Sequence, residues 1–184
     1  SDDKVSEESF KILEQLLETA KTLQITDIVI PCVDQSSLET KEAVNRFVEQ
    51  ITKIIPKIEK QNINLSLETD LAPQPFIELL DKLNSKNITV NYDIGNSAAL
   101  GFDSDEELNA YGDRITDIHI KDRILGGGPV MLGEGNANFV KFFGKLKEFD
   151  YQGPFIMQAY RDEEGISIFK SQLKWIKDIF HSSL

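Results

Sequence analysis

The chain has 184 residues, of which 40% are hydrophobic and 28% charged, and its formal net charge is −11. This composition is typical of one globular domain with a substantial core, and no apolar run approaches the roughly 20 residues that a membrane span needs. A surface this acidic repels phosphate backbones and the lysines are scattered among glutamates, so we expect neither a nucleic-acid partner nor a membrane partner.

Helix-like and strand-like segments alternate along the sequence. Helices are predicted where apolar residues recur every three or four positions, and strands where short β-branched runs are bounded by turn residues. In chain order the predicted elements are helix 6–24, strand 26–31, helix 40–60, strand 64–68, a helix from Pro73 that includes Leu83, strand 88–93, a helix near 97–111, strand 115–120, a glycine-rich loop 121–135, helix 138–148, strand 154–159 and helix 166–181. Five such alternations predict a single α/β domain over residues 1–184, with a parallel sheet.

Two local signals bear on the helix ends. Ser6 is followed by two glutamates, which is typical of a residue that caps a helix N-terminus. Pro56 interrupts the helical pattern of residues 40–60, and proline lacks the N–H that a helix interior needs. We therefore expect the first helix to begin at Ser6 and the second to kink or end at Pro56.

Four of the predicted strands end in a polar side chain that can hold a metal ion. These side chains are Glu68, Asp93, His119 and Gln158. Because the carboxyl ends of parallel strands in an α/β fold converge on one mouth, we expect these groups to meet. An oxygen-rich set with one imidazole suits Mg²⁺, Mn²⁺, Co²⁺ or Zn²⁺.

Each of these residues alone has a simpler explanation. Asp93 lies just before Gly95, where an aspartate in a turn needs no function. His119 is flanked by isoleucines and could be a hydrogen-bonded core residue, and Glu68 could lie on a surface edge. The combination at successive strand ends favours the metal site, where a bound cation stabilises the enediolate that forms when a sugar loses a proton.

Three stretches carry a resemblance to a known family. They are the segment His119–Arg123, the glycines at 126–128 and the segment 132–139. Together with the order Glu68, Asp93, His119, they resemble the xylose isomerase-like TIM barrels, a superfamily of sugar isomerases and epimerases that also includes endonuclease IV. The segments are similar to the branch of hexulose-6-phosphate isomerases and L-ribulose-5-phosphate 3-epimerases, and the resemblance runs from about residue 6 to the end.

The resemblance implies roles for the strand-end residues. Glu68, Asp93 and His119 match the first three metal ligands of the family, and Glu68 also matches one of its two acid/base carboxylates. Gln158 stands where the family has a second glutamate that is both ligand and acid/base group. A glutamine oxygen can coordinate a cation but cannot take a proton, so a one-base 1,2-isomerisation with Glu68 is favoured over two-base epimerisation.

The length of the chain departs from the family pattern. A (β/α)₈ barrel typically takes about 250 residues, and this chain provides about five parallel βα units. The resemblance implies that they correspond to strands 4–8, so we expect a partial TIM barrel that lacks the first three βα units. Its two sheet edges would lie open, to be covered by a missing N-terminal segment or by a second copy of the chain.

Three cationic residues near the strand ends are candidate contacts for an anionic sugar or sugar phosphate. Arg123 and the glycines at 126–128 could bind a phosphate through a charged fork and backbone N–H groups, and Arg161 follows the last strand. Lys121 lies beside the site, although a solvated loop is the favoured explanation for this residue. Gly-rich loops are common, and the spacing here is not that of a Rossmann or P-loop motif.

Two other functions remain open at this point. A barrel-derived module that binds without catalysis is favoured by Gln158 and by the absent strands. Endonuclease-like phosphodiester cleavage is disfavoured, because such sites use more histidines and this chain has only His119 and His181. Cys32 is the only cysteine and no signal peptide is visible, so we expect a cytoplasmic protein.

Overall fold

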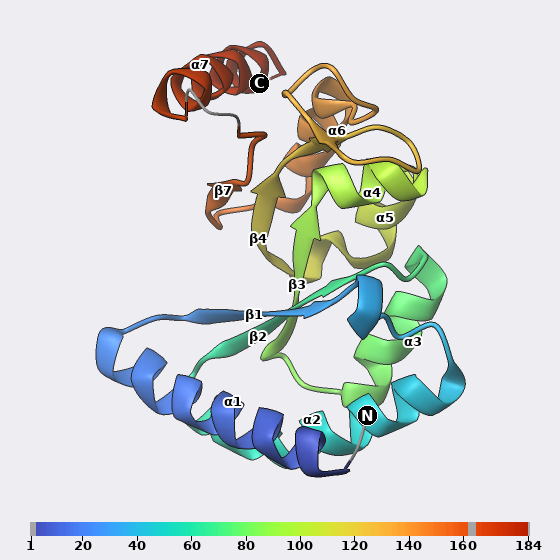
Figure 1. The fold of residues 1–184 in the computed structure, drawn as a ribbon, viewed down its shortest axis with the longest axis vertical. Coiled ribbons are helices and arrows are strands. Elements are labelled where there is room, and N and C mark those ends of the chain that lie inside the picture. Colours follow the sequence, from blue (N-terminus) through green and yellow to red (C-terminus); the bar gives the residue numbers. More distant parts are fainter. Residues whose placement is uncertain (1–2, 162–164, 184) are drawn as a thin grey trace.

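The computed structural model describes residues 3–161 and 165–183. Its centre is a five-stranded parallel sheet in the order β1-β2-β3-β4-β7. The strands are β1 (Asp27–Cys32), β2 (Asn64–Thr69), β3 (Ile88–Asp93), β4 (Ile115–Ile120) and β7 (Phe155–Met157). The strand direction turns strongly between β1 and β4, so that the sheet is twisted rather than flat (Figure 1). The predicted α/β class with a parallel sheet is confirmed.

Helices connect the strands and cover one face of the sheet. They are α1 (Asp3–Leu23), α2 (Lys41–Gln61), α3 (Pro73–Leu83), α4 (Ile94–Leu100), α5 (Ser104–Tyr111), α6 (Phe139–Leu146) and α7 (Ile166–Ser183). Short 3₁₀ turns lie at η1 (Asp34–Ser36), η2 (Gly112–Arg114) and η3 (Lys147–Phe149). Helices α1 to α3 flank β1 and β2, whereas α6 and α7 lie at the other end of the molecule (Figure 1).

Four sequence-based details differ in the structure. Helix α1 already includes residue 3, so the prediction that Ser6 caps it is wrong. Helix α2 continues through Pro56 to Gln61 and its N-cap is Thr40, so Pro56 does not end it. The helix predicted near 97–111 is two helices, because Gly101 adopts a left-handed φ of 76° and ends α4. The glycine-rich loop contains two short strands of two residues each, β5 (Asp122–Arg123) and β6 (Pro129–Val130), which pair antiparallel.

The two faces of the sheet differ in chemistry. Apolar strand residues such as Leu65 and Ile118 are fully buried against the helices. On the opposite face, Ser66 shares hydrogen bonds with Thr89 and Thr116 at oxygen–oxygen distances of 2.8 and 2.6 Å. Because side chains alternate along a strand, one set forms the core and the other makes a polar inner surface. The strand-end residues of the candidate site continue this polar surface.

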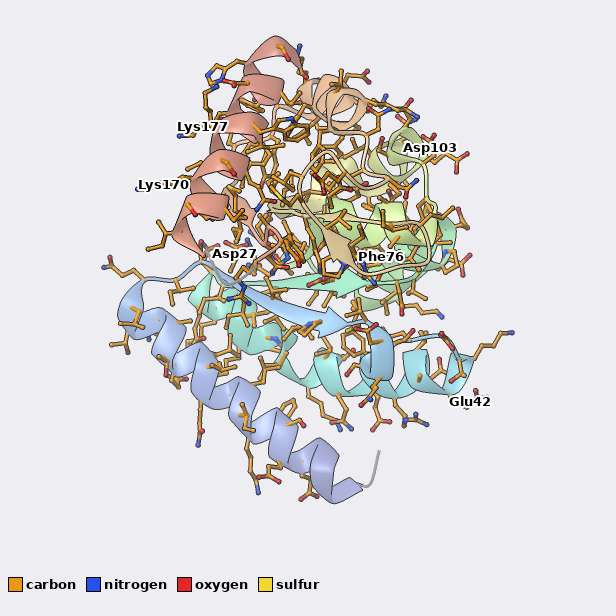
Figure 2. The ribbon with its side chains drawn as sticks, turned by 45° about the horizontal axis from the view of Figure 1, so that its top comes forward. Asp27, Glu42, Phe76, Asp103, Lys170 and Lys177 are labelled. Atoms are coloured by element: carbon orange, nitrogen blue, oxygen red, sulfur yellow. The ribbon has the colours of Figure 1, made fainter. Side chains whose placement is uncertain are left out.

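Burial falls from the centre of the sheet toward its edge. All six residues of β3 are buried, whereas Phe155 and Ile156 of β7 are 39% and 40% exposed. Lys170 and Lys177 project from the outer side of α7, and Phe76 lies in the interior beside α5 (Figure 2). Within the described residues, no helix is both long and apolar enough to cross a membrane.

Candidate metal centre

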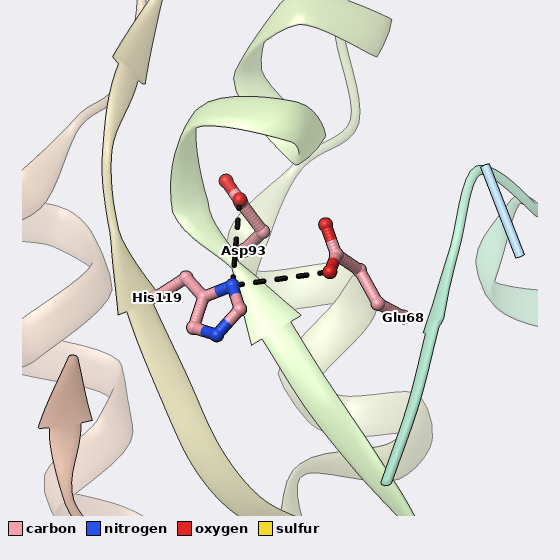
Figure 3. Close-up of side chains that lie close together, drawn as sticks. All are labelled: Glu68, Asp93 and His119. Carbon is pink, nitrogen blue, oxygen red and sulfur yellow. Dashed lines mark ion pairs between the residues drawn. The ribbon is translucent and has the colours of Figure 1, made fainter. Parts of the chain in front are cut away.

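The site lies at the carboxyl ends of the three central strands β2, β3 and β4. Asp93 is the last residue of β3 and pairs in register with His119 of β4, and Glu68 is the last but one residue of β2. The three side chains point toward one another (Figure 3). The prediction that these strand ends converge is therefore confirmed for Glu68, Asp93 and His119.

One imidazole nitrogen faces both carboxylates. His119 Nδ1 lies 3.7 Å from Asp93 Oδ2 and 3.9 Å from Glu68 Oε2 (Figure 3). One ligand atom from each of the three residues lies within 4.8 Å of the others. Two atoms that share a cation at about 2.0–2.2 Å can be no more than about 4.4 Å apart, so both distances to the imidazole suit a shared ion.

The buried atoms that face each other lack hydrogen-bond partners. Asp93 Oδ2 and His119 Nδ1 are both inaccessible to solvent and neither makes a hydrogen bond within the structure. An unsatisfied buried polar atom is costly, and it is stabilised when a cation or a proton occupies the space between such atoms. The donor set of two carboxylates and one imidazole therefore fits a divalent metal ion.

The surroundings of Glu68 favour its protonated form. Burial raises the pKa of Glu68, and the nearby negative charge of Asp93 raises it further. The electrostatic interactions with His119 and Lys121 and the hydrogen bond from Asn96 lower the pKa of Glu68 and act in the opposite direction. A carboxylate whose pKa lies above its ordinary range is better matched to proton transfer near neutral pH than a solvated one.

Asn96 was missed by the sequence analysis although it contacts both carboxylates. Its side-chain Nδ2 donates to Glu68 Oε1 at 2.7 Å, and its backbone N–H donates to Asp93 Oδ1 at 2.8 Å. The second bond caps α4, which begins directly after β3. A polar residue three positions after a strand-end aspartate was the available signal, since that spacing is typical of a capped first turn.

Gly95 allows α4 to lie close to the end of β4. A Cβ atom at this position would lie 2.8 Å from Lys121 Cγ and 2.9 Å from the Lys121 backbone carbonyl carbon. Both separations are too short for carbon atoms, so only glycine permits this approach. The approach brings Asn96 between Glu68 and the loop that follows β4.

Lys121 lies beside the cluster and Arg123 is bound within the loop. Lys121 Nζ is 3.5 Å from Asp93 Oδ2, so it contacts the site directly. Arg123 donates twice to the carbonyl oxygen of Gly127, at 3.1 and 2.9 Å, and once to Asn96 Oδ1. The N–H groups of Gly126 and Gly127 donate to backbone carbonyls, so these loop donors are engaged by the protein itself. A substrate contact by Arg123 stays a prediction.

Gln158 and Arg161 lie along an open groove of about 880 Å³ next to the cluster. The groove is also lined by Lys121, Tyr160 and Phe169. The backbone N–H of Gln158 donates to the carbonyl of Ile120 at 3.0 Å, which places it beside the end of β4. Its side chain is exposed, as is that of Arg161, and the predicted metal contact of Gln158 stays a prediction.

Asp122 organises the loop after β4. Its carboxylate accepts hydrogen bonds from the backbone N–H groups of Arg123, Gly133, Gly135 and Ala137, at 2.9 to 3.0 Å. The side chain is fully buried, and a Cβ on Gly135 would lie 2.1 Å from its Oδ1. Asp122 and the segment 132–139, which both carried the family resemblance, therefore contact each other through these hydrogen bonds.

Comparisons with known proteins agree with this architecture. Residues 1–179 match the family model of the xylose isomerase-like TIM barrel. The chain belongs to this family. It is similar to a putative L-ribulose-5-phosphate 3-epimerase, SgbU, of Haemophilus influenzae, with 28% identity over 95% of this chain and 66% of that protein. The xylose isomerase-like chain thus spans about two thirds of the length of this relative.

Solved structures share the fold at low sequence identity. A crystal structure of the IolI protein with a bound zinc atom has a TM-score of 0.81 and 19% identity, covering 100% of this chain and 73% of that one. A structure of L-ribulose 3-epimerase has a TM-score of 0.80 and 15% identity, and the match covers 100% of this chain and 70% of that one. At these identities the likeness shows that the chain has the fold of a TIM-barrel protein, and the function rests on the residues of the site.

Proposed function

We propose that this protein is a metal-dependent isomerase or epimerase of a sugar or sugar phosphate, with Glu68 as the base. The observation that carries the proposal is the buried cluster in which Glu68, Asp93 and one unsatisfied imidazole nitrogen face the same point. The sequence relative is named a putative L-ribulose-5-phosphate 3-epimerase and one structural neighbour an L-ribulose 3-epimerase, and these names support the reaction class.

In this proposal the ligands of a divalent ion are Glu68, Asp93 and His119, helped by Gln158. Mn²⁺, Mg²⁺, Co²⁺ and Zn²⁺ all suit this donor set, and the zinc atom in the IolI structure is consistent with it. When bound, such a cation withdraws electrons from the sugar carbonyl and stabilises the negative charge of the enediolate.

The side chains of the chain itself supply the proton transfer and the binding of the substrate. Glu68 removes a proton from the hydroxyl-bearing carbon next to the carbonyl and returns it to the former carbonyl carbon, while the hydroxyl proton passes to the former carbonyl oxygen. Gln158 cannot take a proton, which favours a one-base reaction. Lys121 and Arg161 line the groove and offer positive charge to a phosphate group, while Arg123 holds the loop between β5 and β6 through the carbonyl of Gly127.

The five strands are proposed to correspond to strands 4–8 of an eight-stranded barrel, within a single domain over residues 1–184. The open order of the sheet, with β1 and β7 at its edges, supports this assignment, as does the 66% coverage of the sequence relative. A further N-terminal segment of βα units, or a second copy of the chain, would cover these edges. Sedimentation of the chain tests the second arrangement, because a stable dimer doubles the measured mass. A cytoplasmic location also stays a prediction.

The proposed reaction is tested by proton exchange. The protein is incubated in D₂O with Mn²⁺ and L-ribulose 5-phosphate or another ketose phosphate, and deuterium at the carbons beside the carbonyl is followed by NMR. We expect exchange by the wild type, loss of exchange in Glu68→Gln with the circular dichroism spectrum unchanged, and normal exchange in the control Glu39→Gln, whose side chain is exposed. Full exchange in Glu68→Gln would refute the role of this residue.

The alternative is a barrel-derived module that binds without catalysis. The specific observation in its favour is Gln158, an uncharged residue at the position where the family has a second glutamate that acts as ligand and acid/base group. Calorimetric titration with Mn²⁺ separates the two ideas. Micromolar binding that is lost in His119→Ala, together with deuterium exchange, supports the enzyme, whereas Mn²⁺ binding without any exchange supports the module.

A further inference from the structure

We propose that Asn96 is a positioning residue that keeps the carboxylate cluster free to receive a divalent cation. It does so by holding the outer oxygens of the two carboxylates and by accepting hydrogen bonds from Lys121 and Arg123, so that the ammonium group of Lys121 is shared between Asn96 and Asp93 rather than held by the carboxylates alone. This inference rests on the proposed function, because it presumes that Glu68, Asp93 and His119 bind a metal ion.

Asn96 divides the four carboxylate oxygens into two sets. It holds Glu68 Oε1 through its side-chain amide and Asp93 Oδ1 through its backbone N–H, at 2.7 and 2.8 Å. The remaining oxygens, Glu68 Oε2 and Asp93 Oδ2, are the ones that face His119 Nδ1 at 3.9 and 3.7 Å. One residue thus leaves each carboxylate with a single oxygen directed at the imidazole.

The amide oxygen of Asn96 binds cationic side chains. Its Oδ1 accepts from Arg123 Nη1 at 2.9 Å and from Lys121 Nζ at 3.2 Å. The same ammonium group lies 3.5 Å from Asp93 Oδ2, which is an inner oxygen of the cluster. Without the amide oxygen the carboxylates become the nearest acceptors for Lys121, and a monovalent ammonium there competes with a divalent ion for the same charge.

Asparagine is suited to this place because it carries a donor and an acceptor and no charge. An aspartate would repel Glu68, and a lysine or arginine would itself occupy the cluster. The placement of the side chain is fixed by the fold, since Asp93 caps α4 and the close contact of Gly95 with Lys121 sets the distance between α4 and β4. The side chain is therefore held in place before any cation binds.

The first test is the Mn²⁺ affinity of the full chain, measured by calorimetry. We expect Asn96→Ala to weaken binding by about 10- to 100-fold, which is the usual cost of removing a residue that orients a metal ligand. Asn96→Leu keeps the branched shape and is expected to lose as much, so a folding defect in one variant does not decide the result. Asn109→Ala removes an exposed asparagine from α5 and is expected to bind normally.

The second test asks whether the effect acts through Lys121. In the Lys121→Met background the competing ammonium group is absent. Asn96→Ala is therefore expected to weaken Mn²⁺ binding much less there than in the wild type. Independent sites would instead give additive costs, equal in both backgrounds to within about twofold. A merely structural role of Asn96 predicts that additive result.

The outcomes separate this inference from the proposed function. If His119→Ala abolishes Mn²⁺ binding while Asn96→Ala and Asn96→Leu bind as tightly as the wild type, the metal site stands and the role of Asn96 is overturned. Equal costs of Asn96→Ala in the two Lys121 backgrounds also overturn it. If the wild type binds no Mn²⁺ at all, the proposed function fails and the inference fails with it.

Discussion

The centre of the sheet and its β7 edge carry similar residues but differ in how deeply these residues are buried. Isoleucines of adjacent strands illustrate the contrast, because Ile118 of β4 is fully buried whereas Ile156 of β7 is 40% exposed. The same contrast holds for the polar strand ends, since His119 is 5% exposed and Gln158 is open to solvent. The central strands are covered by neighbours on both sides, and β7 pairs with β4 alone among the described strands.

This difference shows where the candidate chemistry can be precise. Side chains that are packed on all sides keep one orientation, and Asp93 and His119 are buried in this way while Glu68 is half-buried beside them. The groove beside β7 is open, so the positions of Gln158 and Arg161 depend on whatever contacts that edge. The predictions below test this contrast from the largest expected effect to the smallest.

The contrast in burial predicts very different costs for the same substitution on the two strands. Ile118→Ala is expected to lower the free energy of unfolding by roughly 2–5 kcal/mol, because it leaves a cavity in the core. Ile156→Ala is expected to cost less than about 1 kcal/mol, since much of that side chain is already in contact with water. Urea unfolding of both variants measures the difference, and equal costs would mean that β7 is as buried as β4 in solution.

Asp122→Ala is expected to destabilise the protein by about 3 kcal/mol. The substitution removes the acceptor of four partly buried backbone N–H groups, which then lose their hydrogen-bond partner within the protein. Urea unfolding measures the loss, with Asp113→Ala as a control at an exposed position. An Asp122→Ala protein as stable as the control would contradict the role of this carboxylate in the loop.

The Mn²⁺ affinities of two variants sharpen the same contrast at the site. His119→Ala removes the buried imidazole that we propose as a ligand and is expected to weaken binding by at least about 100-fold. Gln158→Ala removes an uncharged group on the open side, and a loss of about tenfold is expected. Calorimetry under identical conditions gives both values. A larger loss for Gln158→Ala would show that the edge closes tightly around the ion.

The smallest expected effect is the contribution of Glu107 to the pH dependence of the free energy of unfolding. Its buried carboxylate accepts hydrogen bonds from Tyr92, Ser97 and Tyr111, but burial still raises its pKa above the ordinary value of 4.5. Above pH 4.5 the folded state therefore binds this proton more tightly than the unfolded state, and the contribution of Glu107 to stability falls as the pH rises through its folded pKa.

The variant Glu107→Gln tests this sign. It has no proton to lose, so its free energy of unfolding is expected to fall less than that of the wild type between about pH 5 and about pH 8. Urea unfolding at several pH values measures both slopes. A steeper fall in the variant would show that the pKa of Glu107 is lowered rather than raised.

Much of the fold could be predicted from the sequence because the periodicities are local. The alternation of strands and helices, and the positions of Glu68, Asp93 and His119 at strand ends, follow from side-chain patterns within single elements. The break between α4 and α5 was missed, because a glycine inside a helical pattern does not reveal whether it ends the helix. The first turn of α1 was missed because Ser6 looks like a cap in isolation.

The sequence by itself determined which groups can meet, since parallel strands carry their last residues to one edge of the sheet. Only the tertiary structure decided how they meet. It turned single oxygens of Glu68 and Asp93 toward one imidazole nitrogen, and it placed Asn96 across both carboxylates. The physical reason is that hydrogen bonds between residues distant in sequence depend on the separation of α4 and β4, which no local pattern encodes.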